Sequence, residues 1–269
     1  MRRIKLLNVG IHNIKMVELL ENLRKGGVVF TPNVDHMMKL QRDKQFYSVY
    51  QKADYRVCDS KILMYASNFL GTPVTEKISG SDLFPAFYKY YQHDENIKIF
   101  LLGAVDEVVK TAQQKINAKV GRDIVSAVHS PSFGFEKNDV ECQQIIEMIN
   151  DTDATVLAIG VGAPKQELWI AKHKKELKNI KIFLAIGATI NFEAEKVKRS
   201  PKWISEIGFE WLYRLLSEPR RLWKRYLLDA LPFFSLIIKQ KLQIYKDPWL
   251  ESEENTSNNL PLRESLRRM

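Results

Sequence analysis

The sequence predicts an α/β protein in which a mostly parallel sheet carries helices on both faces and is followed by a basic helical appendage. Three observations support this fold class. Short apolar runs alternate with helical segments through residues 1–195, which is the pattern of successive β-α units. The strand signal then stops near Ser200. The excess of Lys and Arg is concentrated after residue 195.

Seven short β-rich runs are the candidate strands. Several are continuously apolar, as expected of strands that are covered on both faces. The seven runs are Lys5–Val9, Val28–Thr31, Tyr55–Cys58, Lys98–Leu102, Ile124–Val128, Thr155–Ile159 and Ile182–Ile186.

The segments between these runs have helical periodicity. Because a helical segment separates most consecutive runs, the chain can return to the same edge each time and neighbouring strands can run parallel. The helical segments are Asn13–Arg24, Val34–Lys44, Ser60–Leu70, Ser81–Gln92, Val105–Val120, Asp139–Asn150 and Ala163–Leu177.

Beyond the last strand only helical signals remain. Ser200-Pro201 is typical of an N-cap followed by proline at the first helical position. A helix is predicted to restart at Ser217-Glu218-Pro219, and a further helical piece covers Phe233–Tyr245. The chain after Trp249 is polar, and we expect it to be disordered. The predicted division is a core over residues 1–195, an appendage over 196–246 and a tail over 247–269.

Size and composition exclude several classes of protein. A chain of 269 residues with 45% hydrophobic and 27% charged residues is neither a disordered protein nor a disulfide scaffold. Its two cysteines, Cys58 and Cys142, favour a reducing compartment. The longest apolar stretch, Leu227–Ile238, contains Asp229 and Pro232 and is too short to cross a bilayer. We expect a cytoplasmic protein.

The positive charge is concentrated in one segment. Residues 196–246 carry 12 Lys and Arg against 4 Asp and Glu, whereas the whole chain has a net charge of +9. The same segment contains Trp203, Trp211 and Trp223. A basic and aromatic segment indicates an anionic partner such as lipid headgroups, phosphates or nucleic acid. A solvated basic helical face is the alternative.

The ends of the predicted strands supply the candidate site. Ligands of open parallel sheets bind beyond the carboxyl ends of the strands. Glycines there permit close backbone approach, and helix N-termini favour phosphate, so this edge suits a nucleotide. The residues that come after strands are Thr31, Asn33, Asp59, Gly103, Gly160, Gly162, Gly187 and Asn191.

Metal and dinucleotide signatures are missing from the sequence. There is no Gly-x-Gly-x-x-Gly fingerprint, no P-loop and no Cys/His cluster with zinc spacing. Asp151-Thr152-Asp153 resembles a metal-binding pair, but it precedes its strand and belongs at the opposite edge of the sheet. We therefore predict no metal and no cofactor. A lone carboxylate such as Asp59 can act as a general base, or it can be the N-cap of the next helix.

Several blocks of sequence resemble the WecG/TagA/CpsF glycosyltransferase family over roughly residues 1–245. The segments Gly162-Ala163-Pro164-Lys165-Gln166-Glu167 and Glu218-Pro219-Arg220-Arg221 are the most specific. The other matching blocks are Thr31–Asp35, Ala53–Asp59, Lys77–Leu83, Phe100–Gly103, Lys196–Pro201 and Glu210–Leu216.

The resemblance implies a Rossmann-like core and an inverting transfer that requires no metal. In that family the donor is a UDP-sugar, often UDP-N-acetylmannosamine, and the acceptor is a sugar on undecaprenyl diphosphate in bacterial surface-polymer synthesis. The resemblance also implies that the appendage meets the inner face of the membrane. Asp59 matches the catalytic Asp, and Thr31, Asn33 and Gln166 match pocket residues. The remaining substrate-binding candidates are Lys77, Gly80, Asp82, Gly103, Gly160, Gly162, Pro164, Lys165, Glu167 and Asn191.

Two departures from the family pattern concern the donor. Ser60 comes after Asp59 where the family usually has Gly, and Lys77 stands where Arg is common. A Lys is a point charge and cannot make the bidentate contact of an Arg. The donor therefore stays open, with UDP-glucose and UDP-glucuronate as alternatives.

Without a metal, cations must stabilise the departing diphosphate. The candidates are Arg214, Arg221 and Arg225, of which the last two lie one helical turn apart. The alternative is that these arginines serve only membrane electrostatics. A nucleic-acid-binding protein would explain the basic segment but not the residues at the strand ends, so we predict no nucleic-acid partner. The sequence leaves the oligomeric state open, a homo-oligomer included.

Overall fold

The fold is built around one parallel sheet. The computed structural model describes residues 1–197 and 219–250, without the side chains of 219–229. Its central strands are β3 (Gly27–Phe30), β4 (Tyr55–Arg56), β5 (Ile99–Gly103), β6 (Val125–His129), β7 (Val156–Gly160) and β8 (Ile182–Ala185). They lie in the order β4-β3-β8-β7-β5-β6, and every neighbouring pair is parallel. The predicted fold class is confirmed.

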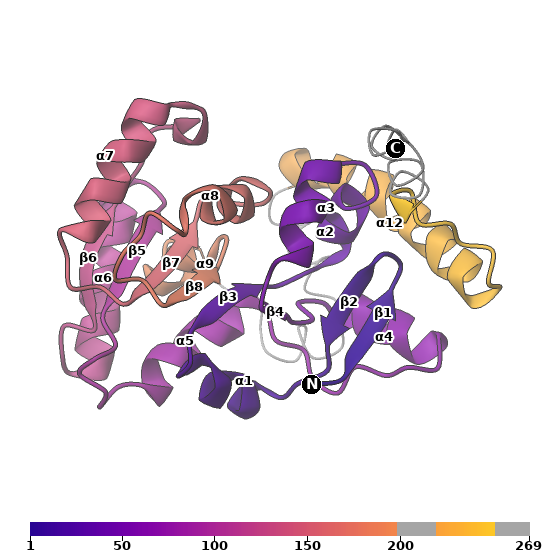
Figure 1. The fold of residues 1–269 in the computed structure, drawn as a ribbon, viewed down its shortest axis with the longest axis horizontal. Coiled ribbons are helices and arrows are strands. Elements are labelled where there is room, and N and C mark those ends of the chain that lie inside the picture. Colours follow the sequence, from indigo (N-terminus) through magenta and orange to yellow (C-terminus); the bar gives the residue numbers. More distant parts are fainter. Residues whose placement is uncertain (198–218, 251–269) are drawn as a thin grey trace, which may run out of the picture.

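Helices cover both faces of this sheet (Figure 1). One face packs against α1 (Met16–Leu23), α5 (Gly80–Tyr90), α6 (Asp106–Val120) and α9 (Thr189–Glu193). The other packs against α2 (Val34–Lys39), α3 (Lys44–Gln51), α7 (Asp139–Asn150) and α8 (Lys165–His173).

The alternation of strand side chains fills both cores. Phe100 and Leu102 of β5 belong to one buried cluster, whereas Ile99 and Leu101 belong to the other. Successive strand residues point to opposite faces, so a strand covered on both sides must be apolar throughout. This requirement is the reason that continuous apolar runs predicted the inner strands β3, β5, β7 and β8.

The first predicted strand, Lys5–Val9, is wrong. The segment contains the end of β1 (Arg3–Leu6), a tight turn and the start of β2 (Val9–His12), which form a separate antiparallel hairpin. Leu7 and Asn8 in the turn are buried, and the Asn8 amide donates to the Leu40 carbonyl at 3.0 Å. The run is apolar because the turn itself is covered, not because it belongs to the central sheet.

The hairpin closes the edge of the sheet next to β4. The buried guanidinium of Arg56 donates to the carbonyls of Gly10, Tyr50 and Gln51, each at 2.9 Å. Its backbone N–H donates to His12 Nδ1 at 2.9 Å. These bonds cover an edge strand that would otherwise expose unpaired backbone groups.

Three helical predictions need correction. The helix predicted over Val34–Lys44 ends at Lys39, and a second helix, α3, begins at Lys44 and continues to Gln51, because the Asp43 side chain accepts from the Phe46 N–H at 2.9 Å and caps it. The short helix α9 lies in a segment for which no helix was predicted. The pieces predicted to restart near Ser217 and at Phe233 are one helix, α12 (Pro219–Lys241), which continues through Pro232. The helix predicted from Ser200 lies outside the described residues.

Helix α12 is attached to the core at the end of the molecule opposite β6 and α7 (Figure 1). Phe233 and Ile237 are buried in the same cluster as the hairpin. Beyond the helix, the Tyr245 hydroxyl donates to Gln41 at 2.7 Å and the Trp249 indole donates to the Leu40 carbonyl at 2.8 Å. The helix therefore has a fixed position on α2 and the hairpin, along with α4 (Lys61–Phe69).

Gly103 and Gly160 let the ends of β5, β7 and β8 approach each other. A Cβ on Gly103 would lie 2.7 Å from the Gly160 carbonyl oxygen, and its φ is +132°. A Cβ on Gly160 would lie 2.5 Å from the Gly187 carbonyl oxygen and 2.7 Å from Ile190 Cδ1. Neither space accommodates a side chain.

We expect Gly160→Ala to lower the free energy of unfolding by about 1–3 kcal/mol, because the backbone must shift to admit the methyl group. Gly10→Ala is the matched control: it lies in β2, and its Cβ would meet its nearest neighbour at 3.6 Å. Urea denaturation of both variants measures the difference. Equal stabilities would contradict the close contact.

Candidate active site

The candidate residues gather along one edge of the sheet. Because the strands are parallel, their carboxyl ends share that edge in the order β4, β3, β8, β7, β5. The sequence-predicted residues are therefore arranged in turn along it: Asp59 after β4, Thr31 and Asn33 after β3, Asn191 after β8, Gly160 and Gly162 at β7, and Gly103 at β5.

Asp59 lies beside Asn33. The Asp59 N–H donates to the Pro32 carbonyl at 2.9 Å, and Asn33 Nδ2 is 3.5 Å from Asp59 Oδ2. Asn33 is itself fixed, because its Oδ1 accepts from the His36 N–H at 3.1 Å as the N-cap of α2. The Asp59 side chain is half-buried at the carboxyl edge of the sheet.

Ser60, and not Asp59, is the N-cap of α4. The Ser60 hydroxyl accepts from the Ile62 N–H at 3.2 Å. This decides against the capping alternative for Asp59. It also gives the serine, which departs from the family pattern, a structural role.

Lys77 and Asp82 form a half-buried ion pair in the segment that leads into α5. The segment is held against β4 because the Ile78 N–H donates to the Cys58 carbonyl at 2.7 Å. Lys77 Nζ lies 2.7 Å from Asp82 Oδ2, and the Ser79 hydroxyl donates to the same oxygen at 2.6 Å. Lys77 therefore has a carboxylate partner in the structure.

Gln166 connects the loops that leave β7 and β8. Its Oε1 accepts from the backbone N–H of Gly162 at 3.3 Å and from that of Gly187 at 3.2 Å, while its Nε2 donates to Glu167 Oε1 at 2.9 Å. Both side chains are buried. The amide was predicted to contact substrate; in the structure it ties together two backbone segments of the site wall.

Glu167 lies behind that wall. Its side chain is fully buried, and Oε2 has no hydrogen-bond partner among the described residues. Burial raises the pKa of this carboxyl to about 7, against the opposing effect of the Gln166 hydrogen bond. Glu167 Oε1 accepts the hydrogen bond of the Gln166 amide and so holds that side chain in place behind the wall.

The segment after β7 has two further connections. Lys39 Nζ donates to the Ala163 carbonyl at 3.2 Å and pairs with Asp35 at 2.9 Å, which links α2 to this loop. The Ala163-Pro164 peptide is cis. These contacts place the loop close to the end of β3, where Asn33 lies.

Lys165 turns toward the loop after β6. Its Nζ lies 3.2 Å from Glu136 and 4.5 Å from the centre of the Phe133 ring. Phe133 is fully exposed and was not a candidate in the sequence analysis. Phe133 comes shortly after the predicted strand Ile124–Val128, and this position was the only signal in the sequence that could have made it a candidate. Gly80 is buried, and a Cβ there would lie 3.2 Å from the Ile186 carbonyl oxygen, so it serves close packing of α5.

The arginines proposed for the diphosphate are not placed by side chain. Arg221 and Arg225 belong to α12, whose side chains are described only from residue 230, and Arg214 lies outside the described residues. Asp153 lies before β7, at the opposite edge, and pairs with Lys98 there. Within residues 1–197 and 219–250 there is no group of three His, Cys, Asp or Glu side chains arranged to hold a metal.

Comparison with known proteins identifies the family. The model of the glycosyl transferase WecG/TagA/CpsF family matches residues 4–247. The chain belongs to this family.

The relatives of this WecG/TagA/CpsF glycosyltransferase include proteins from Staphylococcus aureus strains MW2 and NCTC 8325. Both are named N-acetylglucosaminyldiphosphoundecaprenol N-acetyl-beta-D-mannosaminyltransferase. Each is 26% identical over 253 residues, which cover 91% of this chain and 95% of the relative. In the part of the chain that the structure describes, no helix is long and apolar enough to span a bilayer.

The burial of Glu167 predicts a pH-dependent stability of the glycosyltransferase. Between its ordinary pKa of 4.5 and the raised value of about 7, the folded protein holds a proton that the unfolded chain has lost. The free energy of unfolding therefore falls as the pH rises through this window, by up to about 3 kcal/mol. Glu167→Gln keeps an acceptor for Gln166 but cannot ionise, so its stability relative to wild type should increase between pH 5 and pH 8.

Urea denaturation at both pH values measures this difference. Glu107→Gln, at an exposed position of α6, is the control for the loss of one carboxylate. A stability difference between wild type and Glu167→Gln that is the same at pH 5 and pH 8 would contradict the assignment.

Proposed function

We propose that this glycosyltransferase moves N-acetylmannosamine from UDP-N-acetylmannosamine to a sugar on undecaprenyl diphosphate, with inversion at the anomeric carbon. Family membership and the names of the relatives support the sugar and the acceptor. The single observation that carries the proposal is the position of Asp59. Its carboxylate lies at the carboxyl edge of the parallel sheet, against Asn33.

Asp59 is the proposed general base. It accepts the proton of an acceptor hydroxyl while that oxygen forms a bond to the anomeric carbon of the donor. The bond between this carbon and the diphosphate oxygen breaks at the same time, and UDP leaves. Attack from the side opposite the leaving group inverts the configuration. Asn33, which is fixed as a helix cap, orients the Asp59 carboxylate.

The glycine-rich part of the edge is the proposed place of the UDP diphosphate. Gly162 leaves open space near the start of α8, where the helix N-terminus suits phosphate oxygens, and the close contact of Gly103 with Gly160 brings the end of β5 next to it. The departing diphosphate is further stabilised, in this proposal, by Arg214, Arg221 and Arg225, since guanidinium groups suit phosphate geometry. The proposed reaction uses no metal or other cofactor.

The acceptor determines the proposed location of the protein. Undecaprenyl diphosphate is anchored in a bilayer, so the protein acts at the inner face of the bacterial membrane through residues 196–246. Their net charge of +8 suits anionic headgroups.

A panel of sugar nucleotides tests the donor. With an acceptor that carries N-acetylglucosamine on a short prenyl diphosphate, UDP release should be at least tenfold faster from UDP-N-acetylmannosamine than from UDP-glucose or UDP-glucuronate. A faster reaction with either alternative donor would leave the proposed transfer reaction in place but show that the donor sugar is not N-acetylmannosamine. UDP release that needs no acceptor would contradict transfer.

Asp59→Asn tests the base. We expect kcat to fall by about 10²–10⁴-fold, which is the usual contribution of general-base catalysis, while the KM for the donor stays within about twofold. Asp153→Asn, at the opposite edge of the sheet, is the matched control and should keep wild-type kcat. An Asp59→Asn variant with nearly intact turnover would exclude Asp59 as the base.

A further inference from the structure

Helix α12 exposes an apolar face although its other side is buried in the core. Phe233 and Ile237 face the core, and the exposed side chains recur at helical spacing on the opposite side. Leu231, at 71%, is the most exposed of these side chains. The α12 outer face consists of Leu231, Phe234 and Ile238, together with Leu242 directly after the end of the helix.

The end of α4 lies next to the end of α12. Phe69, the last residue of α4, is half-exposed, and Lys241 Nζ lies 5.5 Å from the centre of its ring. A contiguous exposed apolar surface of this kind marks an interaction site more often than a solvated face. A bilayer is one such partner for an amphipathic helix.

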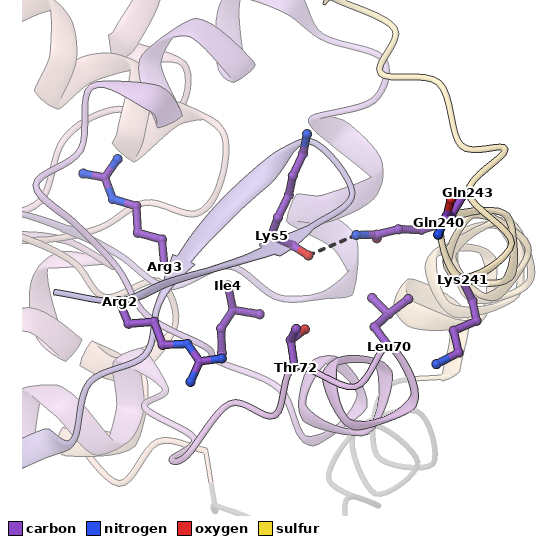
Figure 2. A pocket seen from close by; sticks show the side chains of 9 residues that line it. All are labelled: Arg2, Arg3, Ile4, Lys5, Leu70, Thr72, Gln240, Lys241 and Gln243. Carbon is purple, nitrogen blue, oxygen red and sulfur yellow. Dashed lines mark hydrogen bonds between the residues drawn. The ribbon is translucent and has the colours of Figure 1, made fainter.

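A basic pocket opens beside Phe69, between β1, the end of α4 and the end of α12. It has a volume of about 440 Å³, and Ile4 and Leu70 form its apolar part. In Figure 2 the side chains of Arg2 and Lys241 lie on either side of Thr72 and Leu70. The lining residues are Arg2, Arg3, Ile4, Lys5, Leu70, Thr72, Gln240, Lys241 and Gln243.

The pocket has a strongly positive lining. Four of its nine residues are Lys or Arg, and none is Asp or Glu. Arg2 and Lys241 form no ion pair with a carboxylate within the described ranges. The buried His12 next to Arg3 has a pKa lowered to about 4, by burial first and then by Arg56 and Arg3. An anion entering here meets cations that are not already neutralised.

The walls of the pocket are held together by Gln240. Its Oε1 accepts from the Leu7 N–H at 2.8 Å and its Nε2 donates to the Lys5 carbonyl at 3.0 Å, the bond drawn in Figure 2. The end of α12 is thus bonded to the backbone of the hairpin. Arg2 and Lys241, which come from opposite ends of the sequence, are kept at one opening.

We propose that this pocket binds the phosphate of an anionic phospholipid headgroup while the α12 outer face and Phe69 enter the adjoining acyl region. A free phosphate would explain the cations but not the apolar side chains that border them. The inference rests on the proposed function only in that a lipid-linked acceptor requires a bilayer. It adds the N-terminal hairpin and α4 to a membrane contact that the sequence placed in residues 196–246.

Co-sedimentation with vesicles tests the pocket. The full-length protein is mixed with phosphatidylcholine vesicles with or without phosphatidylglycerol, and Arg2→Gln/Lys241→Gln is compared with Lys25→Gln/Lys175→Gln, which removes two exposed charges elsewhere. At about 1 kcal/mol per basic residue, the pocket variant should bind anionic vesicles about 30-fold more weakly. The control should change by less than threefold. If both variants lost the same affinity for anionic vesicles, the pocket assignment would be overturned, because net charge alone would explain the binding.

Two further arms separate the sources of the anion and the role of the apolar face. Phe234→Ser/Ile238→Ser should weaken binding to both kinds of vesicle, whereas Val140→Ser on α7 should not. Glycerol 3-phosphate at millimolar concentration should displace little protein from anionic vesicles. Full displacement by glycerol 3-phosphate, or unchanged binding of the serine variant, would overturn the lipid assignment.

The test is independent of catalysis. UDP release with a short, water-soluble acceptor should be the same for wild type and the pocket variant, because the pocket lies away from Asp59. If neither the wild type nor any variant releases UDP, the proposed function is contradicted. The vesicle-binding result still decides whether the pocket binds lipid. Loss in the pocket variant alone would overturn the separation of the two sites.

Discussion

The arrangement of the site depends on a backbone contact between the ends of β5, β7 and β8. No side chain fits between Gly103, Gly160 and Gly187, so the loops that leave these strands start close together. This closeness lets one amide, that of Gln166, accept hydrogen bonds from both Gly162 and Gly187. Gln166 therefore fixes the two loops relative to each other, and these loops border the proposed nucleotide site.

Much of this edge could be predicted from the sequence. Strands buried on both faces are continuously apolar, and in a parallel sheet the residues after each strand must lie at a common edge. The hairpin could not be predicted in the same way, because Leu7 and Asn8 are buried by α12 and α2, contacts that join distant parts of the chain. Local patterns record that a segment is covered but not which element covers it.

Glu167 shows a second limit. In the sequence it belongs to a polar block with Lys165 and Gln166, which indicates a surface that meets a ligand. In the structure α8 is buried on the side that carries Gln166, Glu167 and Trp169. A buried carboxyl with a raised pKa is costly. Its bond to Gln166 is the compensation that the structure supplies, and no spacing rule distinguishes such a supporting residue from a ligand-binding one.

The proposed catalytic edge and the proposed membrane-binding surface are connected through α12 and α2. α12 packs on α2 through the buried Phe233 and Ile237, and α2 begins at Asn33, whose amide lies against Asp59. If the outer face of α12 enters the bilayer as proposed, this contact fixes the orientation of α2, and with it the edge that carries the proposed base, relative to the bilayer. For an acceptor that cannot leave the lipid, this orientation matters as much as the chemistry, because attack on the anomeric carbon needs the hydroxyl to arrive along one direction.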